Sequence, residues 1–178
     1  MNAMTKRIAI AFFLLCMFNN AFAQNVTIEQ VLSLRTKPLS YIDEFLTGKN
    51  WELIEANEPS DEKIGALSFA YKKSSIDDTA ESFINFYYTN YSVSNNMLSF
   101  QVITPSKYNS YLTKIKALGY KLQNSFVDKG EFIKVYQKNG ITIKINTSTQ
   151  KDDEDSSTQT TYVFNILTNS MYNIIYNQ

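Results

Sequence analysis

The chain has 178 residues, no histidine and one cysteine, and its 17 basic and 17 acidic residues give a formal net charge of zero at pH 7. This composition excludes a Ser–His–Asp triad, a histidine base and the HExxH zinc motif, and the five scattered glycines form no phosphate-binding loop. Without a basic excess, nucleic acid is not expected as a partner.

The first 23 residues are predicted to be a secretory signal peptide. Lys6 and Arg7 form a short basic region, residues 8–18 are an apolar run, and residues 21–23 (Ala-Phe-Ala) give a cleavage signal. The run is too short for a stable membrane span, so we expect an exported protein, periplasmic or extracellular. We expect no membrane span after cleavage; an uncleaved anchor is the alternative.

Cleavage leaves 178 − 23 = 155 residues without a cysteine, because Cys16 lies in the signal peptide. The exported chain therefore has no disulfide and no cysteine metal site, and its core must hold it together. It keeps 15 basic and 17 acidic residues, and Arg35 is the only arginine. We predict no cofactor.

Helix and strand signals follow one another along the first half of the mature chain. Thr27 and Gln30 form a capping box for a helix ending near Leu34. Pro38 opens a second helix that Gly48 ends. The predicted elements that follow are the helix Leu39–Thr47 and strands beginning with Trp51–Ile54 and covering Ala66–Lys73, Ser82–Tyr88 and Met97–Thr104.

The second half repeats this order. Pro105 and Ser106 open a helix with apolar residues at helical spacing, and Asn139-Gly140 predicts a tight hairpin turn. The tail from Ser170 begins like a further helix and then stops. The predicted strands begin with Tyr120–Leu122 and cover Glu131–Gln137, Ile141–Asn146 and Thr161–Thr168.

An internal repeat connects the two halves. Phe100–Asn109 (FQVITPSKYN) returns as Phe164–Asn173 (FNILTNSMYN), at a spacing of 164 − 100 = 64. Trp51 and Tyr120 correspond at 69, and Tyr71 and Tyr136 at 65. We predict an α+β protein with two tandem helix-plus-four-stranded units, residues 24–104 and 105–178, joined into one curved antiparallel sheet with helices on one face. Chance matches between Tyr- and Asn-rich strands are the alternative.

This element order resembles the β-lactamase inhibitor protein family, in which two helix-plus-four-strand units join into one curved sheet. The resemblance concerns element order across the mature chain and implies the fold alone. The disulfides and diagnostic motifs of that family are absent, so it implies no site residues. The composition is also similar to that of uncharacterised exported proteins of Gram-negative bacteria.

The alternation of the strands predicts one apolar and one partly polar sheet face. The apolar residues that should face the helices are Leu98, Phe100, Val102, Ile141, Ile143, Ile145, Tyr162, Phe164 and Ile166. The other face should carry Asn85, Tyr87, Ser99, Gln101, Lys134, Tyr136, Thr142, Lys144, Asn146 and Asn165. Tyrosine gives a large contact area at low entropic cost, so this face suits a protein or glycan partner. The alternative is an ordinary solvated face.

We therefore predict a non-catalytic exported binding or inhibitor-type module. Its candidate binding residues are Tyr87, Gln101, Lys134, Tyr136, Lys144 and Asn165. One alternative is a carboxylate-based hydrolase acting on glycans, which needs two acids facing each other across a cleft. Another is a structural envelope protein. The acidic run Asp152–Asp155 is interpreted as a solvated hairpin loop, with a Ca²⁺ site as the alternative.

Overall fold

The structure is a computed structural model that describes residues 26–61, 63–76, 79–90, 92, 95–151 and 158–176. The predicted signal peptide, with Cys16, lies outside the described residues. The acidic run Asp152–Asp155, with the solvated loop and the calcium site considered for it, also lies outside the described residues.

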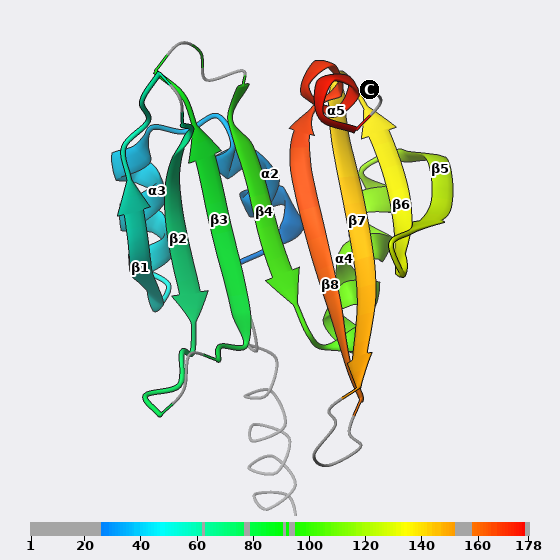
Figure 1. The fold of residues 1–178 in the computed structure, drawn as a ribbon, viewed down its shortest axis with the longest axis horizontal. Helices are drawn as coiled ribbons and strands as arrows, with labels where there is room; N and C mark the ends of the chain where they lie inside the picture. The colour runs from blue at the N-terminus through cyan, green and yellow to red at the C-terminus, as the bar shows by residue number, and fades with distance from the viewer. Residues whose placement is uncertain are drawn as a thin grey trace, which may run out of the picture.

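One antiparallel sheet of eight strands runs through the described part of the chain, in the order β1-β2-β3-β4-β8-β7-β6-β5 (Figure 1). The predicted α+β class with a single curved sheet is confirmed. The strands are β1 (Trp51–Asn57), β2 (Gly65–Tyr71), β3 (Ser82–Tyr88), β4 (Met97–Val102), β5 (Lys121–Asp128), β6 (Glu131–Lys138), β7 (Ile141–Lys151) and β8 (Thr158–Thr168). Pairing between β4 and β8 joins the two halves of the sheet.

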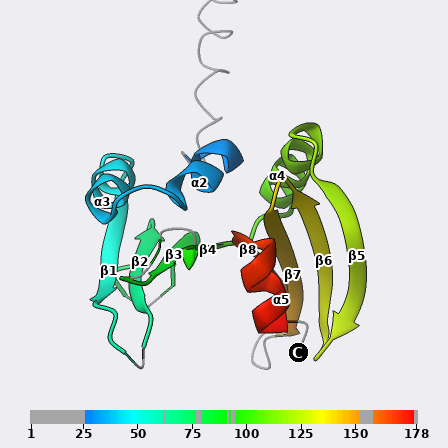
Figure 2. The same ribbon diagram turned by 90° about the horizontal axis from the view of Figure 1, so that it is seen from above.

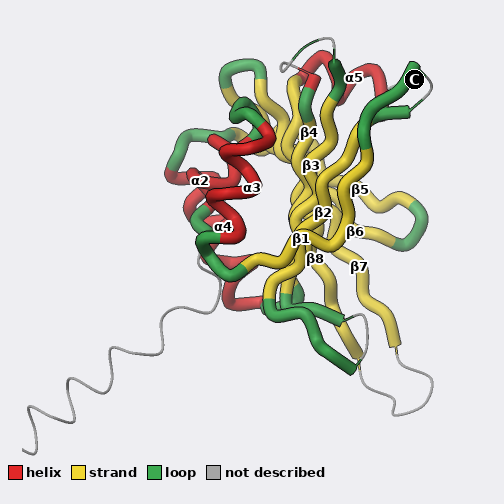
Figure 3. The backbone as a smooth tube through the Cα atoms, turned by 90° about the vertical axis from the view of Figure 1, so that its left-hand side faces the viewer, coloured by secondary structure: helices red, strands yellow, loops and turns green. Residues whose placement is uncertain are grey.

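Three helices cover one face of this sheet, and a fourth lies on the other (Figures 2 and 3). The covered face carries α2 (Ile28–Leu34), α3 (Leu39–Thr47) and α4 (Pro105–Ala117), whereas α5 (Asn169–Tyr176) lies opposite, across one end of β7 and β8. The prediction of helices on one face therefore holds for three helices and is corrected for α5.

Local sequence explains where these elements begin and end. Thr27 and Gln30 form the predicted reciprocal capping box at the start of α2. Gly119 adopts a φ of 89° where α4 turns into β5. Asn139 and Gly140, with φ of 48° and 80°, make the tight turn between β6 and β7.

The main core lies between the sheet and the helices of the covered face. Phe69, Phe86 and Phe164 are fully buried in it, and α3 contributes Ile42 and Leu46. All the apolar strand residues that were predicted to face the helices belong to this core or pack against it: Leu98, Phe100, Val102, Ile141, Ile143, Ile145, Tyr162, Phe164 and Ile166.

The pairing of β4 with β8 is symmetric about the repeated phenylalanines. Phe100 pairs with Phe164, Leu98 with Ile166, and Val102 with Tyr162. At the repeat spacing of 64, Tyr162 is the counterpart of Leu98 and Ile166 that of Val102. A local two-fold axis therefore passes between the two Phe rings, which stack at 4.6 Å.

The edge strands repeat an irregularity as well. The register shifts between Leu53 and Glu55 in β1 and between Leu122 and Asn124 in β5, so the bulges lie 122 − 53 = 69 residues apart. Asn50 and Gly119, also 69 apart, both have positive φ (62° and 89°) just before these strands. These shared bulges and turns support a duplication in addition to the sequence matches. A chance similarity in sequence would not place bulges and positive-φ residues at the same spacing.

The repeated segment nevertheless takes two different routes. Residues 105–109 (PSKYN) open α4 on the covered face, whereas their counterparts 169–173 (NSMYN) open α5 on the opposite face. On the covered face α2 lies next to α4 (Figure 2), and the counterpart of α4 in the first half is α3, which precedes β1 as α4 precedes β5. The two copies of the repeated segment therefore lead to opposite faces of the sheet.

Candidate functional site

We call the face opposite α2, α3 and α4 the open face. Along β3, Phe83, Asn85 and Tyr87 point to it, because Ile84 and Phe86 between them point into the main core. None of the four strands β2, β3, β4 and β8 contains a charged residue. The middle of the open face therefore carries no charge from these strands.

Polar side chains form a row across this face. Asn85 pairs with Ser99, Ser99 with Asn165, and Asn165 with Lys144, on four neighbouring strands. Ser68 on β2 continues the row next to Asn85. Direct cross-strand partners lie about 5 Å apart, so these groups act as one surface.

On the open face, β3 and β4 carry polar side chains that form no hydrogen bond with the described part of the chain. These groups belong to Asn85, Tyr87, Ser99 and Gln101, each of which is partly exposed. Asn165 donates one hydrogen bond, from Nδ2 to Oδ1 of Asn146 at 3.5 Å. A surface of free amides and hydroxyls is available to a polar ligand.

The β7 side of the face is instead satisfied internally. Lys144 is only 7% exposed, donates to Oδ1 of Asn146 at 3.0 Å and lies 4.3 Å from the ring centroid of Tyr176 on α5. Asn146 donates in turn to a carboxylate oxygen of Glu131. Burial lowers the pKa of Lys144, with the Glu131 and Asp128 carboxylates acting in the opposite direction.

The structure thus divides the six predicted binding residues. Tyr87, Gln101 and Asn165 lie on the open face as predicted, and Lys144 lies there beneath α5. Lys134 and Tyr136 lie on the covered face. Asn85 and Ser99 are added to the candidate site. The sequence indicated their face, because each lies between two core residues of its strand.

The prediction that Lys134 and Tyr136 lie on the open face is wrong. Tyr136 is 3% exposed in the main core, and the Lys134 ammonium donates to the Tyr108 hydroxyl of α4 at 2.8 Å. Their neighbours Ile133 and Val135 point to the open face instead, where they pack with Tyr172 of α5. Because α5 covers this part of the open face, both faces of β6 receive apolar side chains.

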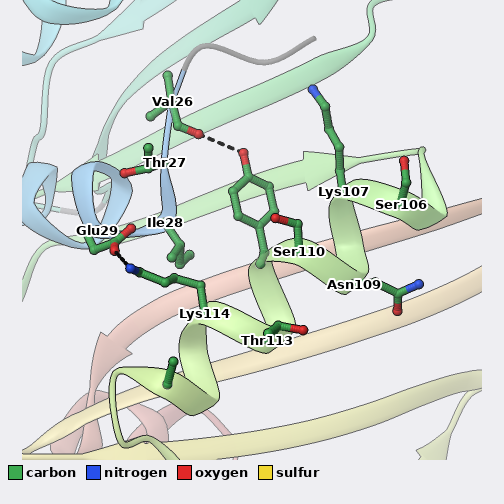
Figure 4. A pocket seen from close by; sticks show the side chains of 12 residues that line it. Val26, Thr27, Ile28, Glu29, Ser106, Lys107, Asn109, Ser110, Thr113 and Lys114 are labelled. Atoms are coloured by element: carbon green, nitrogen blue, oxygen red, sulfur yellow. Dashed lines mark hydrogen bonds and ion pairs between the residues drawn. The ribbon is translucent and has the colours of Figure 1, made fainter. Parts of the chain in front are cut away.

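A separate hollow of about 840 Å³ lies between α2 and α4 (Figure 4). The Tyr111 hydroxyl donates to the Val26 carbonyl at 2.8 Å, and Lys114 pairs with Glu29 at 2.6 Å. These contacts join the two helices and hold the start of α2. The Lys114 hydrogen bond lowers the pKa of Glu29.

Lys107, in the first turns of α4, also lines this hollow (Figure 4). Burial lowers its pKa to about 8, the Glu81 carboxylate opposes this shift, and the Lys72 ammonium adds to it. Lys72 and Glu81 themselves form an ion pair at 2.8 Å.

No two carboxylates among the described residues line the same one of four hollows. Glu29 lines the hollow between α2 and α4 and a smaller one beside Tyr120, and Asp61 lines a third. A fourth, next to Pro105, contains no acid among its described lining residues. No cluster of potential metal ligands occurs among the described residues. No described helix has the length and apolar character of a membrane-crossing segment.

No protein-family model, curated protein or solved structure matches this chain. The resemblance to the β-lactamase inhibitor protein family, and export to the periplasm or the medium, therefore stay predictions.

Proposed function

We propose that the protein is an exported, non-catalytic binding module that holds a macromolecular partner on the open face of β3, β4 and β8. The single observation that supports this most directly is the set of polar groups on Asn85, Tyr87, Ser99 and Gln101 that form no hydrogen bond with any described residue. These groups lie on adjacent strands of a rigid sheet, which fixes their spacing before a partner arrives. Preorganised groups lose little conformational entropy on binding.

The proposal uses a smaller surface than the sequence predicted. Lys134 and Tyr136 belong to the covered face, and Lys144 is committed to α5 and Asn146. The binding surface proposed is therefore Asn85, Tyr87, Ser99, Gln101 and Asn165, with Phe83 at its margin. The hydrolase alternative has no pair of facing carboxylates in its favour among the hollows described above.

A retention experiment with matched variants tests this proposal. The chain from Gln24 is immobilised and exposed to envelope and culture-medium fractions of the producing cell. We expect it to retain a partner that the double variant Asn85→Ala/Gln101→Ala loses. The control, Gln123→Ala/Asn124→Ala, removes two amides from the exposed edge strand β5 and should retain the partner fully.

Equal retention by all three proteins would show that the open face is not the binding surface. Circular dichroism and thermal melts of each variant verify that a loss of binding is not a loss of folding. Surface substitutions of this kind change stability by roughly half a kcal/mol or less.

A further inference from the structure

We infer that the partner held on the open face is a neutral glycan chain. This inference rests on the proposed function and goes beyond it by naming the chemistry of the ligand. Three features of the face lead to it: the absence of charge on its central strands, the alternation of rings and amides along β3, and the extent of the surface.

Charge comes first. The strands β2, β3, β4 and β8 contain no charged residue. Lys144, which lies opposite Asn165 on the open side, is 7% exposed and engaged beneath Tyr176. An anionic or cationic polymer on this face would lose hydration without gaining a counter-charge. The ligand that fits is uncharged.

Hydrogen bonding then selects a polar ligand. Asn85 and Gln101 each offer an amide with two donor hydrogens and one acceptor oxygen, and Ser99 and Tyr87 each offer a hydroxyl. An apolar protein surface laid over them would bury these groups unpaired, at a cost of about 1–3 kcal/mol each. Sugar hydroxyls both donate and accept, so they satisfy amide and hydroxyl groups alike.

Aromatic rings flank the amides. Phe83, Asn85 and Tyr87 project in succession from β3 on the open side, and all three are partly exposed. The two rings are four residues apart, roughly 13 Å along the strand. The C–H face of a pyranose ring packs against an aromatic face while its hydroxyls reach the neighbouring amides. A ring–amide–ring sequence provides both contacts in one line.

Shape favours a chain over a single sugar. Asn85, Ser99 and Asn165 lie on three neighbouring strands, so the surface is roughly 10 Å wide across the strands and 13 Å long. None of the four hollows described above is lined by these residues. A surface of this extent, onto which none of these four hollows opens, contacts several linked sugars at once.

Affinity electrophoresis tests the inference directly. The chain from Gln24 is run through native gels containing laminarin, mannan or dextran as neutral polysaccharides, and heparin or alginate as anionic ones. We expect retardation by at least one neutral polysaccharide and by neither anionic one. Tyr87→Ala and Gln101→Ala should each weaken the apparent affinity about tenfold, the effect of losing one well-made contact.

Matched controls are present elsewhere in the chain. Tyr41 on α3 is 43% exposed and Gln123 lies on the exposed strand β5, so Tyr41→Ala and Gln123→Ala remove the same groups away from the open face. Both controls should be retarded like the unmodified protein. Equal retardation of all four variants would overturn the assignment to this face.

Two further results would overturn the inference. One is retardation by heparin or alginate alone, and the other is no retardation by any of the three neutral polysaccharides. If either occurs while Asn85→Ala/Gln101→Ala still loses the partner retained from cell fractions, the binding function stands and only the neutral-glycan ligand is wrong. If the double variant keeps that partner, the proposed function itself fails.

Discussion

The stacked pair Phe100 and Phe164 gives the most demanding test of the architecture. The two rings are direct cross-strand partners with centroids 4.6 Å apart and an interplanar angle of 10°. They are 2% and 0% exposed. Both rings also contact the Tyr111 ring of α4 edge-on, with centroid distances of 5.3 and 5.9 Å. One helix therefore packs over the place where β4 and β8 pair.

Truncating either ring should strongly lower the free energy of unfolding. Replacing a buried Phe by Ala costs about 3–5 kcal/mol, because it removes apolar contacts and leaves a cavity. Phe164→Ala should lie at the upper end of this range, since Phe164 also meets Tyr108 at 6.1 Å. In the double variant the second truncation removes a ring that has already lost its stacking partner. We therefore expect the sum of the single effects to exceed the double effect by about 0.5–1.5 kcal/mol, the coupling of an aromatic pair.

Urea denaturation of the two single variants and the double variant measures these free energies. Gln101→Ala is the control, because Gln101 is the open-face neighbour of Phe100, and it should change the free energy of unfolding by roughly half a kcal/mol or less. Additive effects of the two truncations would refute a direct stack at the joint. A cost for Gln101→Ala equal to that of Phe100→Ala would mean that the two faces of β4 are assigned the wrong way round.

Three smaller predictions concern the covered face and the chain as a whole. Lys107 has a pKa of about 8, below its ordinary value of 10.5, so the unfolded chain binds more protons between these two pH values. Its destabilising effect is therefore full below pH 8 and fades as the pH rises toward 10.5. Urea melts across pH 7–10.5 should show Lys107→Met more stable than the unmodified protein at pH 7, with the difference shrinking above pH 8. Tyr111→Phe removes the hydrogen bond to the Val26 carbonyl and should lower the free energy of unfolding by about 0.5–1.5 kcal/mol in the same assay. The melting temperature should be unchanged by EDTA, because the sequence has no histidine and the described residues contain no cluster of metal ligands; a fall of several degrees would instead indicate a bound cation.

The order of helices and strands could be predicted because it depends on local signals. The capping box at Thr27, the Asn139-Gly140 turn and the strict alternation after Ile141 each determine nearby backbone without tertiary help. The end of β7 was placed too early, at Asn146. Residues 147–151 are polar, and their strand conformation comes from backbone pairing with β8, which side-chain hydrophobicity does not report.

The faces of β6 could not be predicted from its own residues. Glu131–Lys138 has Phe132, Lys134 and Tyr136 on one side and Ile133 and Val135 on the other. Isoleucine and valine are the more obvious core residues, so the sequence favoured the wrong side. The decision depends on α5, which covers Ile133 and Val135 on the open face. α5 follows β8, so this cover comes from outside the residues of β6.

The burial of Lys144 beneath α5 can be tested through the pKa of this lysine. Tyr176, in the last turn of α5, lies over the Lys144 ammonium at 4.3 Å, and the helix C-terminus is the end that favours a cation. Burial lowers the pKa of Lys144. Tyr176→Ala should open this lysine to water and raise its pKa toward the ordinary range, since desolvation is the main cause of the shift.

Ile174→Ala is the matched control: Ile174 is 57% exposed on the same helix, and its loss should leave the pKa of Lys144 unchanged. Titration of the lysine side chain by ¹³C NMR measures both. If Tyr176→Ala leaves the pKa where it was, α5 is not what buries Lys144, and the division of the open face by the cover of α5 over β7 would have to be abandoned.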